Sequence, residues 1–371
     1  MSKMTRLPSP RLLMGPGPSS VSQGVVDAMG APPIGYLDPE LFELLEGIRV
    51  GLRRLFGTSN QFTVPLTGTG MAGMEACLAN TVSPGDQIVV VAAGYFGERI
   101  AELAVRMGAI VTVVRGEWGR AVDPAQLRAT LEAGPAPVLV AAVHAETSTG
   151  VRQELAPLAE IAHEAGALFL ADTVTSLGGI SVEADKWGVD IAYSAVQKCV
   201  GCPPGLSPVT VSEAVLERAQ KVNLPHGYWF SDFKLLGSYY NAPHVYHHTV
   251  PVNNYYALDA ALSEAFAEGL RERFARHITA SGALLDGLAQ MGVNPLAPTD
   301  CRLPTLNAVI IPDNVDDQQV RTNLLTKHGI EIGGGLGKLK GKIWRIGTMG
   351  HTADLNNVER LLAAMKTELH R

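Results

Sequence analysis

The chain has 371 residues, of which 46% are hydrophobic and 18% are charged. This composition is typical of a folded protein with material for about two domains, and it excludes an intrinsically disordered chain. The formal net charge is −6 and the basic residues are dispersed, so we expect no nucleic-acid partner. No apolar run approaches the roughly 20 residues of a membrane-spanning helix, so we expect no membrane span.

After a Pro-rich arm at residues 1–15, apolar segments alternate with amphipathic ones along the chain. The predicted strands are residues 87–94, 109–116, 137–146, 168–174 and 189–196, and the predicted helices between them are 98–108, 123–134 and 154–166. Continuous apolar strands separated by such helices indicate a mainly parallel sheet that is covered on both faces. The sequence therefore predicts a three-layer α/β/α domain.

Local signals support one of these helices in detail. Asp123 is a good N-cap, Pro124 suits the first helical position, and Gly134 suits the end. A long helical pattern then covers residues 253–292, and shorter strand and helix patterns continue to residue 369. We therefore expect an arm at residues 1–15, a large domain at 16–268 and a small α/β domain at 269–371.

The compartment is predicted from the cysteines and the chain ends. Four cysteines in a chain of this size favour a reducing compartment over a disulfide framework. The first 18 residues contain early prolines and no clean apolar core, unlike a secretory signal. The C-terminal Glu-Leu-His-Arg is no peroxisomal tripeptide, and we expect a cytoplasmic protein.

Residues 68–73, Gly-Thr-Gly-Met-Ala-Gly, form a G-x-G-x-x-G run that leads into a helical pattern. Such a run holds phosphate at a helix N-terminus. A dinucleotide-binding dehydrogenase also needs an acidic residue at the end of the strand about 20 residues on. That strand ends at Ala92–Gly94, whereas Asp86 precedes it. The run indicates a phosphate site, with a dehydrogenase as the rival interpretation.

Polar residues follow two neighbouring strands of the predicted sheet. One strand ends on Asp172 and the next ends on Gln197 and Lys198. Open parallel sheets bind ligands beyond the carboxyl ends of their strands. The pair suggests a lysine that forms a Schiff base and an aspartate that partners a pyridinium nitrogen. Taken alone, such a pair is more often an Asp–Lys ion pair or a solvated loop lysine.

The surrounding motifs decide between these interpretations. In chain order they are GYFGER, HAETSTG, LADTVTSLGG, SAVQKCVGCPPG, YHHTVPV and WRIG. This ordered set resembles the class V aminotransferases, pyridoxal-phosphate enzymes of fold type I, and is most similar to the alanine–glyoxylate and serine–pyruvate group. The resemblance runs from Gly15 almost to the C-terminus. It implies an enzyme that moves an amino group from alanine or serine to glyoxylate or pyruvate.

The resemblance implies roles for five residues around the cofactor ring. Lys198 matches the lysine that forms the Schiff base and later moves a proton. Asp172 matches the acid beside the ring nitrogen. Val174, two residues on in an extended chain, matches the apolar residue on one ring face. Phe96 matches the aromatic on the other face, where many relatives carry Trp, and Gln197 belongs with Lys198 to the cofactor-binding set.

The resemblance also implies the contacts of the phosphate and of the ring hydroxyl. Thr69, Gly70 and Met71 match the cup that holds the phosphate through backbone N–H groups and a hydroxyl. Many relatives carry His at the position of Met71, so only its backbone amide is assigned here. Thr147 matches a hydroxyl residue near the cofactor's 3-hydroxyl.

By the same resemblance, Arg345 matches the arginine that binds the substrate carboxylate through its planar fork. Gly17 and the pair Gly35–Tyr36 match segments that approach the substrate, the pair coming from the partner subunit. Tyr246 and Thr249 match residues that reach the cofactor phosphate of the neighbouring subunit. The implied active unit is a homodimer with shared active sites.

Other interpretations predict different features. His247 and His248 suggest a metal site, but adjacent residues in an extended chain point to opposite faces and no H-x-x-x-H spacing accompanies them. Cys199 and Cys202 form a lone C-x-x-C, which we interpret as two small buried thiols.

Another class V enzyme, such as a lyase, a desulfurase or a transaminase for other substrates, is the nearest rival. A desulfurase needs a cysteine on a mobile loop, for which Cys301 is the candidate. An inactive scaffold protein on this fold is disfavoured because Lys198, Asp172 and Arg345 are all present.

Overall fold

The computed structural model describes residues 9–222 and 228–369. Its main sheet has seven strands in the order β2-β10-β9-β8-β5-β3-β4. The bounds are β2 Phe62–Thr67, β3 Gln87–Ala92, β4 Ile110–Arg115, β5 Leu139–Val143, β8 Leu168–Asp172, β9 Ile191–Tyr193 and β10 Leu206–Val211. The pairs from β4 through β9 are parallel, and β10 runs antiparallel to both of its neighbours. The predicted mainly parallel sheet is confirmed.

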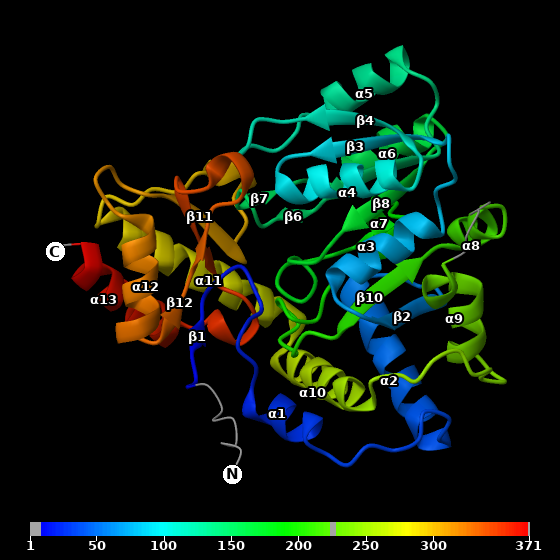
Figure 1. Cartoon of the computed structure of the whole chain (residues 1–371), viewed down its shortest axis with the longest axis horizontal. Helices are drawn as coiled ribbons and strands as arrows, with labels where there is room; N and C mark the ends of the chain where they lie inside the picture. Colours follow the sequence, from blue (N-terminus) through cyan, green and yellow to red (C-terminus); the bar gives the residue numbers. More distant parts are fainter. Residues whose placement is uncertain (1–8, 223–227, 370–371) are drawn as a thin grey trace, which may run out of the picture.

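Helices cover both faces of this sheet (Figure 1). The connection β3-α4-β4 runs toward one edge of the sheet, whereas β5-α6-β8 runs toward the other. Because such crossovers are right-handed, the two connections place α4 and α6 on opposite faces. The helices up to residue 268 are α1 Gln23–Met29, α2 Pro39–Phe56, α3 Gly70–Ala79, α4 Tyr95–Arg106, α5 Pro124–Ala133, α6 Ala156–Glu164, α7 Ala184–Trp187, α8 Glu213–Ala219, α9 Phe233–Tyr240 and α10 Val252–Glu268.

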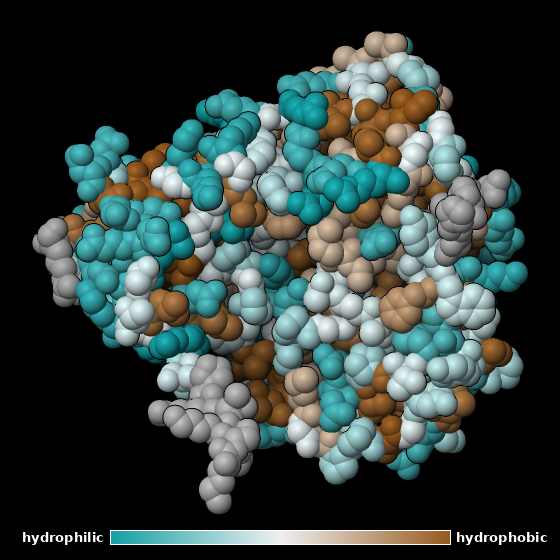
Figure 2. Space-filling model, in the orientation of Figure 1, coloured by the Kyte–Doolittle hydropathy of each residue, from teal (hydrophilic) through white to brown (hydrophobic). Residues whose placement is uncertain are grey.

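The local helix signals have the predicted effect. In α5 the Asp123 side chain accepts a hydrogen bond from the Ala125 N–H, Pro124 begins the helix and Gly134 ends it. In α4 the inner face buries Ile100, Ala101 and Ala104, while hydrophilic side chains cover the outer face (Figure 2). Helix α4 is therefore amphipathic, and its apolar face packs against β3 and β4.

A smaller sheet forms from the C-terminal part of the chain. Its strands are β11 Leu306–Ile310, β14 Ile343–Gly347 and β13 Gly333–Gly334, paired antiparallel in that order. The helices around it are α11 Leu270–Ala289, α12 Asp317–Lys327 and α13 Leu355–Leu369. A separate apolar cluster that includes Leu284, Trp344 and Leu361 fills the space between them.

The long helical pattern at residues 253–292 is broken, contrary to the prediction of one continuous stretch. Helix α10 ends at Glu268 and α11 begins at Leu270, because Gly269 has a φ of 87° that an α-helix does not allow. The division of the chain at residue 268 remains our proposal.

A second correction concerns the strand before Lys198. The sequence analysis ended this strand at Gln197 and Lys198, but β9 ends at Tyr193 and both residues lie in the turn that follows. The backbone leaves the sheet early because it must turn back into β10, which pairs antiparallel with β9.

The N-terminal segment crosses from one sheet to the other. Residues 1–8 of the predicted arm lie outside the described residues. Strand β1, Leu12–Leu13, pairs in parallel with β12, Ile330–Glu331, of the C-terminal part. Within the described ranges 9–222 and 228–369, the structure contains no helix long and apolar enough to cross a membrane.

Candidate active site

Lys198 lies in a pocket at the carboxyl end of the main sheet. The pocket is lined by Thr69, Gly70, Met71, Met74, Phe96, Val143, Ala145, Thr147, Asp172, Val174, Thr175, Tyr193, Gln197 and Lys198. The structure thus brings together all nine of the residues that the sequence analysis assigned to the cofactor in the same subunit. They come from five segments that are far apart in the chain.

The Lys198 amine is poised between its charged and neutral forms. Its Nζ donates a hydrogen bond to the carbonyl oxygen of Pro16. Burial and then the positive charge of Arg345 lower the pKa of Lys198 to about 8. A substantial fraction of this amine is therefore neutral near physiological pH, as a nucleophile or base requires.

Asp172 ends β8 on the floor of the same pocket and is only 3% exposed. Its Oδ2 accepts a hydrogen bond of 2.6 Å from the Tyr193 hydroxyl. Burial raises the pKa of Asp172 to about 6, although the hydrogen bond from Tyr193 opposes this effect. The role of Tyr193 was not predicted from the sequence, because an aromatic residue inside an apolar strand is usually part of the hydrophobic core.

Val174 lies beside Asp172 for a different reason from the predicted one. The sequence analysis placed both residues on one side of an extended chain, but residues 174–176 form a turn after β8. The Val174 N–H donates to Asp172 Oδ1 at 2.8 Å. The aspartate thus holds the turn that places the Val174 side chain in the pocket.

The first turn of α3 forms one end of the pocket. Thr69 is the N-cap of this helix, and its side chain makes no capping hydrogen bond. The first N–H groups of a helix have no acceptor within the helix. The Gly70 and Met71 amides and the Thr69 hydroxyl are therefore available to an anion. The Met71 side chain is 43% exposed.

Glu146 holds the opposite wall in place and is fully buried. Its carboxylate accepts hydrogen bonds from the N–H groups of Phe96 at 3.0 Å and Gly97 at 3.3 Å, at the start of α4. The hydroxyl of Ser148 also donates to it, at 2.6 Å. Burial raises the pKa of Glu146. The sequence pattern predicts only that Glu146 ends a strand, whereas in the structure its carboxylate positions Phe96.

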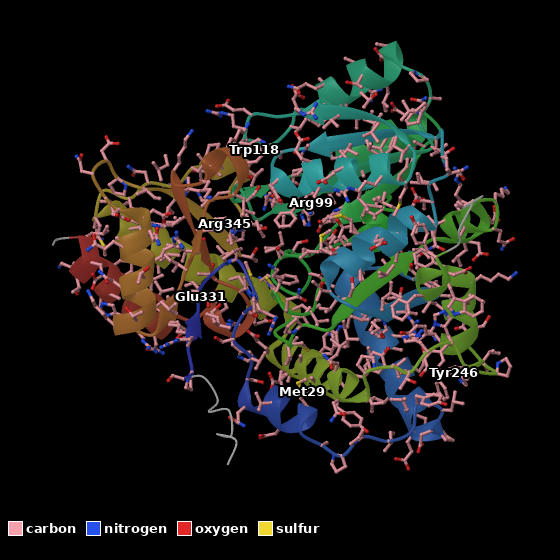
Figure 3. The ribbon with its side chains drawn as sticks, in the orientation of Figure 1. Met29, Arg99, Trp118, Tyr246, Glu331 and Arg345 are labelled. Carbon is pink, nitrogen blue, oxygen red and sulfur yellow. The ribbon has the colours of Figure 1, made fainter. Side chains whose placement is uncertain are left out.

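Arg345 reaches the active site from β14 of the smaller sheet (Figure 3). Its Nε donates to the Gly334 carbonyl at 2.7 Å, and the residue is only 8% exposed. Burial lowers the pKa of Arg345 to about 10, so it stays a cation at neutral pH. Gly17 adjoins Lys198, because a Cβ at Gly17 would overlap the end of that side chain.

Gly35, Tyr36, Tyr246 and Thr249 lie apart from this pocket. Gly35, Tyr36 and Thr249 line one surface pocket, and the rings of Tyr36 and Tyr246 are 5.2 Å apart. All four residues are exposed and none lines the pocket of Lys198. Figure 3 shows Tyr246 on the opposite side of the molecule from Arg345.

The predicted geometry of the His247–His248 pair is wrong. Their Nδ1 atoms are 2.7 Å apart, so the two rings face each other instead of pointing to opposite sides. The segment is not part of a strand, and it follows a turn in which His244 has a φ of 61°. No cluster of at least three His, Cys, Asp or Glu side chains suited to a metal ion occurs in the described ranges 9–222 and 228–369.

Cys199 and Cys202 are free and buried. Their Sγ atoms donate in different directions, to the carbonyls of Thr175 at 3.2 Å and Ala257 at 3.3 Å. Burial raises the pKa of Cys199 to about 12, which keeps it in the unreactive thiol form. The prediction of small buried thiols is confirmed.

A phosphate cup, a buried aspartate and a lysine with a lowered pKa share one pocket at the carboxyl edge of this sheet. Two buried polar atoms that line it, Thr175 Oγ1 and Gln197 Oε1, have no hydrogen-bond partner. Such atoms call for a polar ligand, and a pyridine ring with a hydroxyl and a phosphate fits them. The fold and the pocket define a pyridoxal-phosphate enzyme of fold type I.

Comparison with known proteins gives the family. The family model named aminotransferase class V matches residues 34–360. The chain is 35% identical to the (S)-ureidoglycine–glyoxylate transaminase of Bacillus subtilis (strain 168), over 97% of this chain and 91% of that protein. It is 34% identical to the alanine–glyoxylate aminotransferase of Drosophila melanogaster, over 96% and 91%. The chain belongs to the class V aminotransferases.

A solved structure agrees with this assignment. The crystal structure of an alanine–glyoxylate aminotransferase from Nostoc sp. superposes with a TM-score of 0.96 at 44% identity, covering 100% of this chain and 98% of that chain. The protein is therefore an aminotransferase, and its cofactor is pyridoxal phosphate. When bound, this cofactor supplies an electron sink for the substrate α-carbon.

We predict that the apoenzyme combines with pyridoxal phosphate faster as the pH rises through about 8. Only the neutral Lys198 amine attacks an aldehyde, and an ordinary lysine is largely protonated until about pH 10.4. The rate of appearance of the cofactor absorption band, measured over a pH series, gives the midpoint. Arg345→Met removes a nearby positive charge and should move the midpoint upward. A wild-type midpoint at the ordinary lysine value would contradict the prediction.

We predict that Tyr193→Phe weakens pyridoxal-phosphate binding by about tenfold or more. A hydrogen bond to a charged group contributes about 1.5–3 kcal/mol, and its loss makes the Asp172 carboxylate less stable beside the ring nitrogen. The dissociation constant follows from titration of the apoenzyme by fluorescence. Tyr240→Phe is the matched control, because this buried hydroxyl donates to the Pro65 carbonyl outside the pocket. Equal losses in both variants would reject the role of Tyr193.

Proposed function

We propose that this aminotransferase moves an amino group from a small amino acid, alanine or serine, to glyoxylate or pyruvate. The observation that carries the proposal is the proximity of Lys198, in the turn after β9 of the main sheet, to Arg345, on β14 of the smaller sheet. The amine of Lys198 has a pKa of about 8, and the nearby Arg345 remains a cation. A base beside a carboxylate receptor is suited to substrates whose reacting α-carbon bears a carboxylate.

The residues divide the work of the reaction between them. Arg345 would bind the α-carboxylate in a bidentate manner, which holds the α-carbon near Lys198. Lys198 would then take the proton from that carbon and later return a proton. Asp172 would keep the ring nitrogen of the cofactor protonated. The same carboxylate receptor serves the amino acid and the oxo acid in turn.

The two relatives described above support glyoxylate as the acceptor, because both of their names contain it. They differ in the donor, which is alanine in one name and (S)-ureidoglycine in the other. A different class V reaction is the alternative. A desulfurase has little support, because Cys301 is free, buried and only 7% exposed.

We also propose that the active unit is a homodimer with shared active sites. Gly35, Tyr36, Tyr246 and Thr249 form one exposed cluster away from the pocket of their own subunit. The carbonyl oxygen of Trp229 lies 3.0 Å from Nε2 of His247, the residue after Tyr246. Trp229 is 68% exposed, and large exposed aromatic side chains are typical of protein interfaces. In a two-fold dimer this cluster would face the partner's phosphate cup.

We further propose the cytoplasm as the compartment. All four cysteines of the sequence are free, as expected for a reducing environment. Their burial means that none is offered on the surface for an intermolecular disulfide.

A panel of donors and acceptors tests the proposed reaction. We expect alanine or serine to bleach the cofactor absorption band and glyoxylate or pyruvate to restore it. Lys198→Ala should bind the cofactor without that band and should not transaminate, because no other base replaces the amine. Bleaching by (S)-ureidoglycine alone would transfer the donor assignment to that compound. Release of sulfide from cysteine would favour the desulfurase instead.

Mixing two inactive variants tests the shared site. Lys198→Ala lacks the amine, and the double variant Tyr246→Ala/Thr249→Ala lacks the cluster that faces the partner. Random subunit exchange should restore about a quarter of the wild-type rate, because half of the dimers are hybrids with one intact site. Size-exclusion chromatography with light scattering checks that both variants remain dimers. If the exchanged dimers stay inactive, each site is built within one chain.

A further inference from the structure

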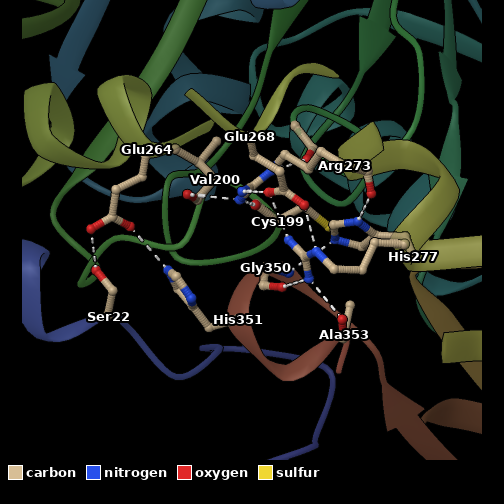
Figure 4. A network of polar contacts seen from close by, with 12 residues as sticks. Ser22, Cys199, Val200, Glu264, Glu268, Arg273, His277, Gly350, His351 and Ala353 are labelled. Carbon is tan, nitrogen blue, oxygen red and sulfur yellow. Dashed lines mark hydrogen bonds and ion pairs between the residues drawn. The ribbon is translucent and has the colours of Figure 1, made fainter. Parts of the chain in front are cut away.

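Two arginines at the start of α11 share one carboxylate (Figure 4). Arg273 Nη1 donates to Glu268 Oε2 at 2.9 Å. Arg276 Nε and Nη2 donate to Glu268 Oε1 at 2.5 Å and Oε2 at 3.0 Å. The break at Gly269 between α10 and α11 brings Glu268 back toward both guanidinium groups. None of these three residues lines the pocket of Lys198.

Arg273 holds the backbone that follows Lys198. It is only 2% exposed. Its Nη2 donates to the carbonyls of Cys199 at 2.7 Å and Val200 at 3.4 Å, and its Nε donates to Gly178 O at 2.9 Å. The fork of one buried side chain thus ties the turn of Lys198 to the loop after β8.

Arg276 and His277 hold a different segment, the turn η4 at Gly350–Thr352. Arg276 Nη1 donates to Gly350 O at 2.8 Å and Ala353 O at 2.7 Å. Gly350 N–H donates to His277 Nε2 at 3.0 Å. Burial lowers the pKa of His277 to about 3, so the ring is neutral and accepts this bond. This turn comes directly after β14, the strand that carries Arg345.

The two held segments touch each other. A Cβ built on Gly350 would lie 3.4 Å from the carbonyl oxygens of both Lys198 and Cys199. The turn that follows Arg345 is therefore packed on the backbone of Lys198 itself. Any shift of one segment is transmitted to the other at this contact, because packed interiors have little free space.

The energetics favour a geometric role over a stabilising one. Burying a guanidinium costs desolvation energy that roughly offsets its attraction to a carboxylate. Here one carboxylate serves two arginines, and backbone carbonyls accept the remaining hydrogen bonds. All of those carbonyls belong to segments that adjoin active-site residues.

We propose that Arg273 and Arg276 are positioning residues that set the place of Lys198 relative to Arg345. This inference rests on the proposed function for the roles of these two active-site residues. Arg273 orients the amine through the carbonyls of Cys199 and Val200. Arg276 orients the carboxylate receptor through the turn Gly350–Thr352. Glu268 fixes the two guanidinium groups relative to each other by accepting hydrogen bonds from both.

The proposal predicts a division of kinetic effects. Arg273→Lys keeps the charge but loses the planar fork, so the amine is misplaced and kcat should fall by about 10- to 100-fold. KM should stay close to that of the wild type. Arg276→Lys should raise KM for alanine and glyoxylate by about tenfold, with kcat changed by less than about threefold. Arg271→Lys, on the exposed face of the same helix, is the matched control.

Two measurements need no turnover. In Arg273→Lys the pH midpoint for cofactor addition to the apoenzyme should move by about half a pH unit or more, whereas Arg276→Lys should leave it in place. L-lactate carries the α-carboxylate without an amino group, and its dissociation constant should rise only in Arg276→Lys. A wild-type protein that fails to transaminate would reject the proposed function, and these two measurements would still test the positioning roles.

Thermal unfolding separates positioning from simple stabilisation. If both variants lower only the melting temperature and otherwise match Arg271→Lys, the inference is overturned. If Arg273→Lys does not fold, Glu268→Gln decides the question, because it keeps the shape and removes the shared charge. It should then lower kcat and raise KM together. The absence of either effect would overturn the inference.

Discussion

The active site depends on two cationic side chains that share a region largely withdrawn from water. Burial opposes the charged forms of both Lys198 and Arg345, and the charge of Arg345 lowers the pKa of Lys198 further. The pKa of Lys198 falls to about 8, whereas that of Arg345 falls only to about 10. One environment therefore holds a partly neutral amine beside a permanent cation, which suits the base and the carboxylate receptor that we propose.

Two buried carboxylates occupy the other side of the site, and hydrogen bonds give them different tasks. Glu146 accepts four hydrogen bonds, from Phe96, Gly97 and the backbone and hydroxyl of Ser148, so it fixes the start of α4. Asp172 accepts only those of Tyr193 and Val174 and faces the pocket. The hydrogen bonds of Glu146 are all made within the protein, at the start of α4 and at Ser148. The carboxylate of Asp172 remains available to a ring nitrogen.

The N-terminal segment links the two sheets at the point where the cationic residues meet. Met14 O accepts a hydrogen bond of 2.8 Å from the N–H of Gly347, the last residue of β14. Pro16 O accepts from the Lys198 amine, and Ser19 Oγ donates to Lys198 O at 2.7 Å. A short stretch of chain thus contacts both the strand of Arg345 and the turn of Lys198. Arg273 and Arg276, the positioning residues that we propose on α11, act on the same two segments from another side.

Features that depend on local residue patterns could be predicted before the structure was known. Apolar runs predicted the parallel strands, Asp123 and Gly134 delimited α5, and the edge rule for parallel sheets brought Asp172 and Lys198 together. The break at Gly269, the turn of Val174 and the contact of His247 with His248 were mispredicted. Each depends on a particular backbone torsion angle or on packing between distant segments. The lowered pKa of Lys198 has the same origin, because only the folded chain brings burial and Arg345 to that amine.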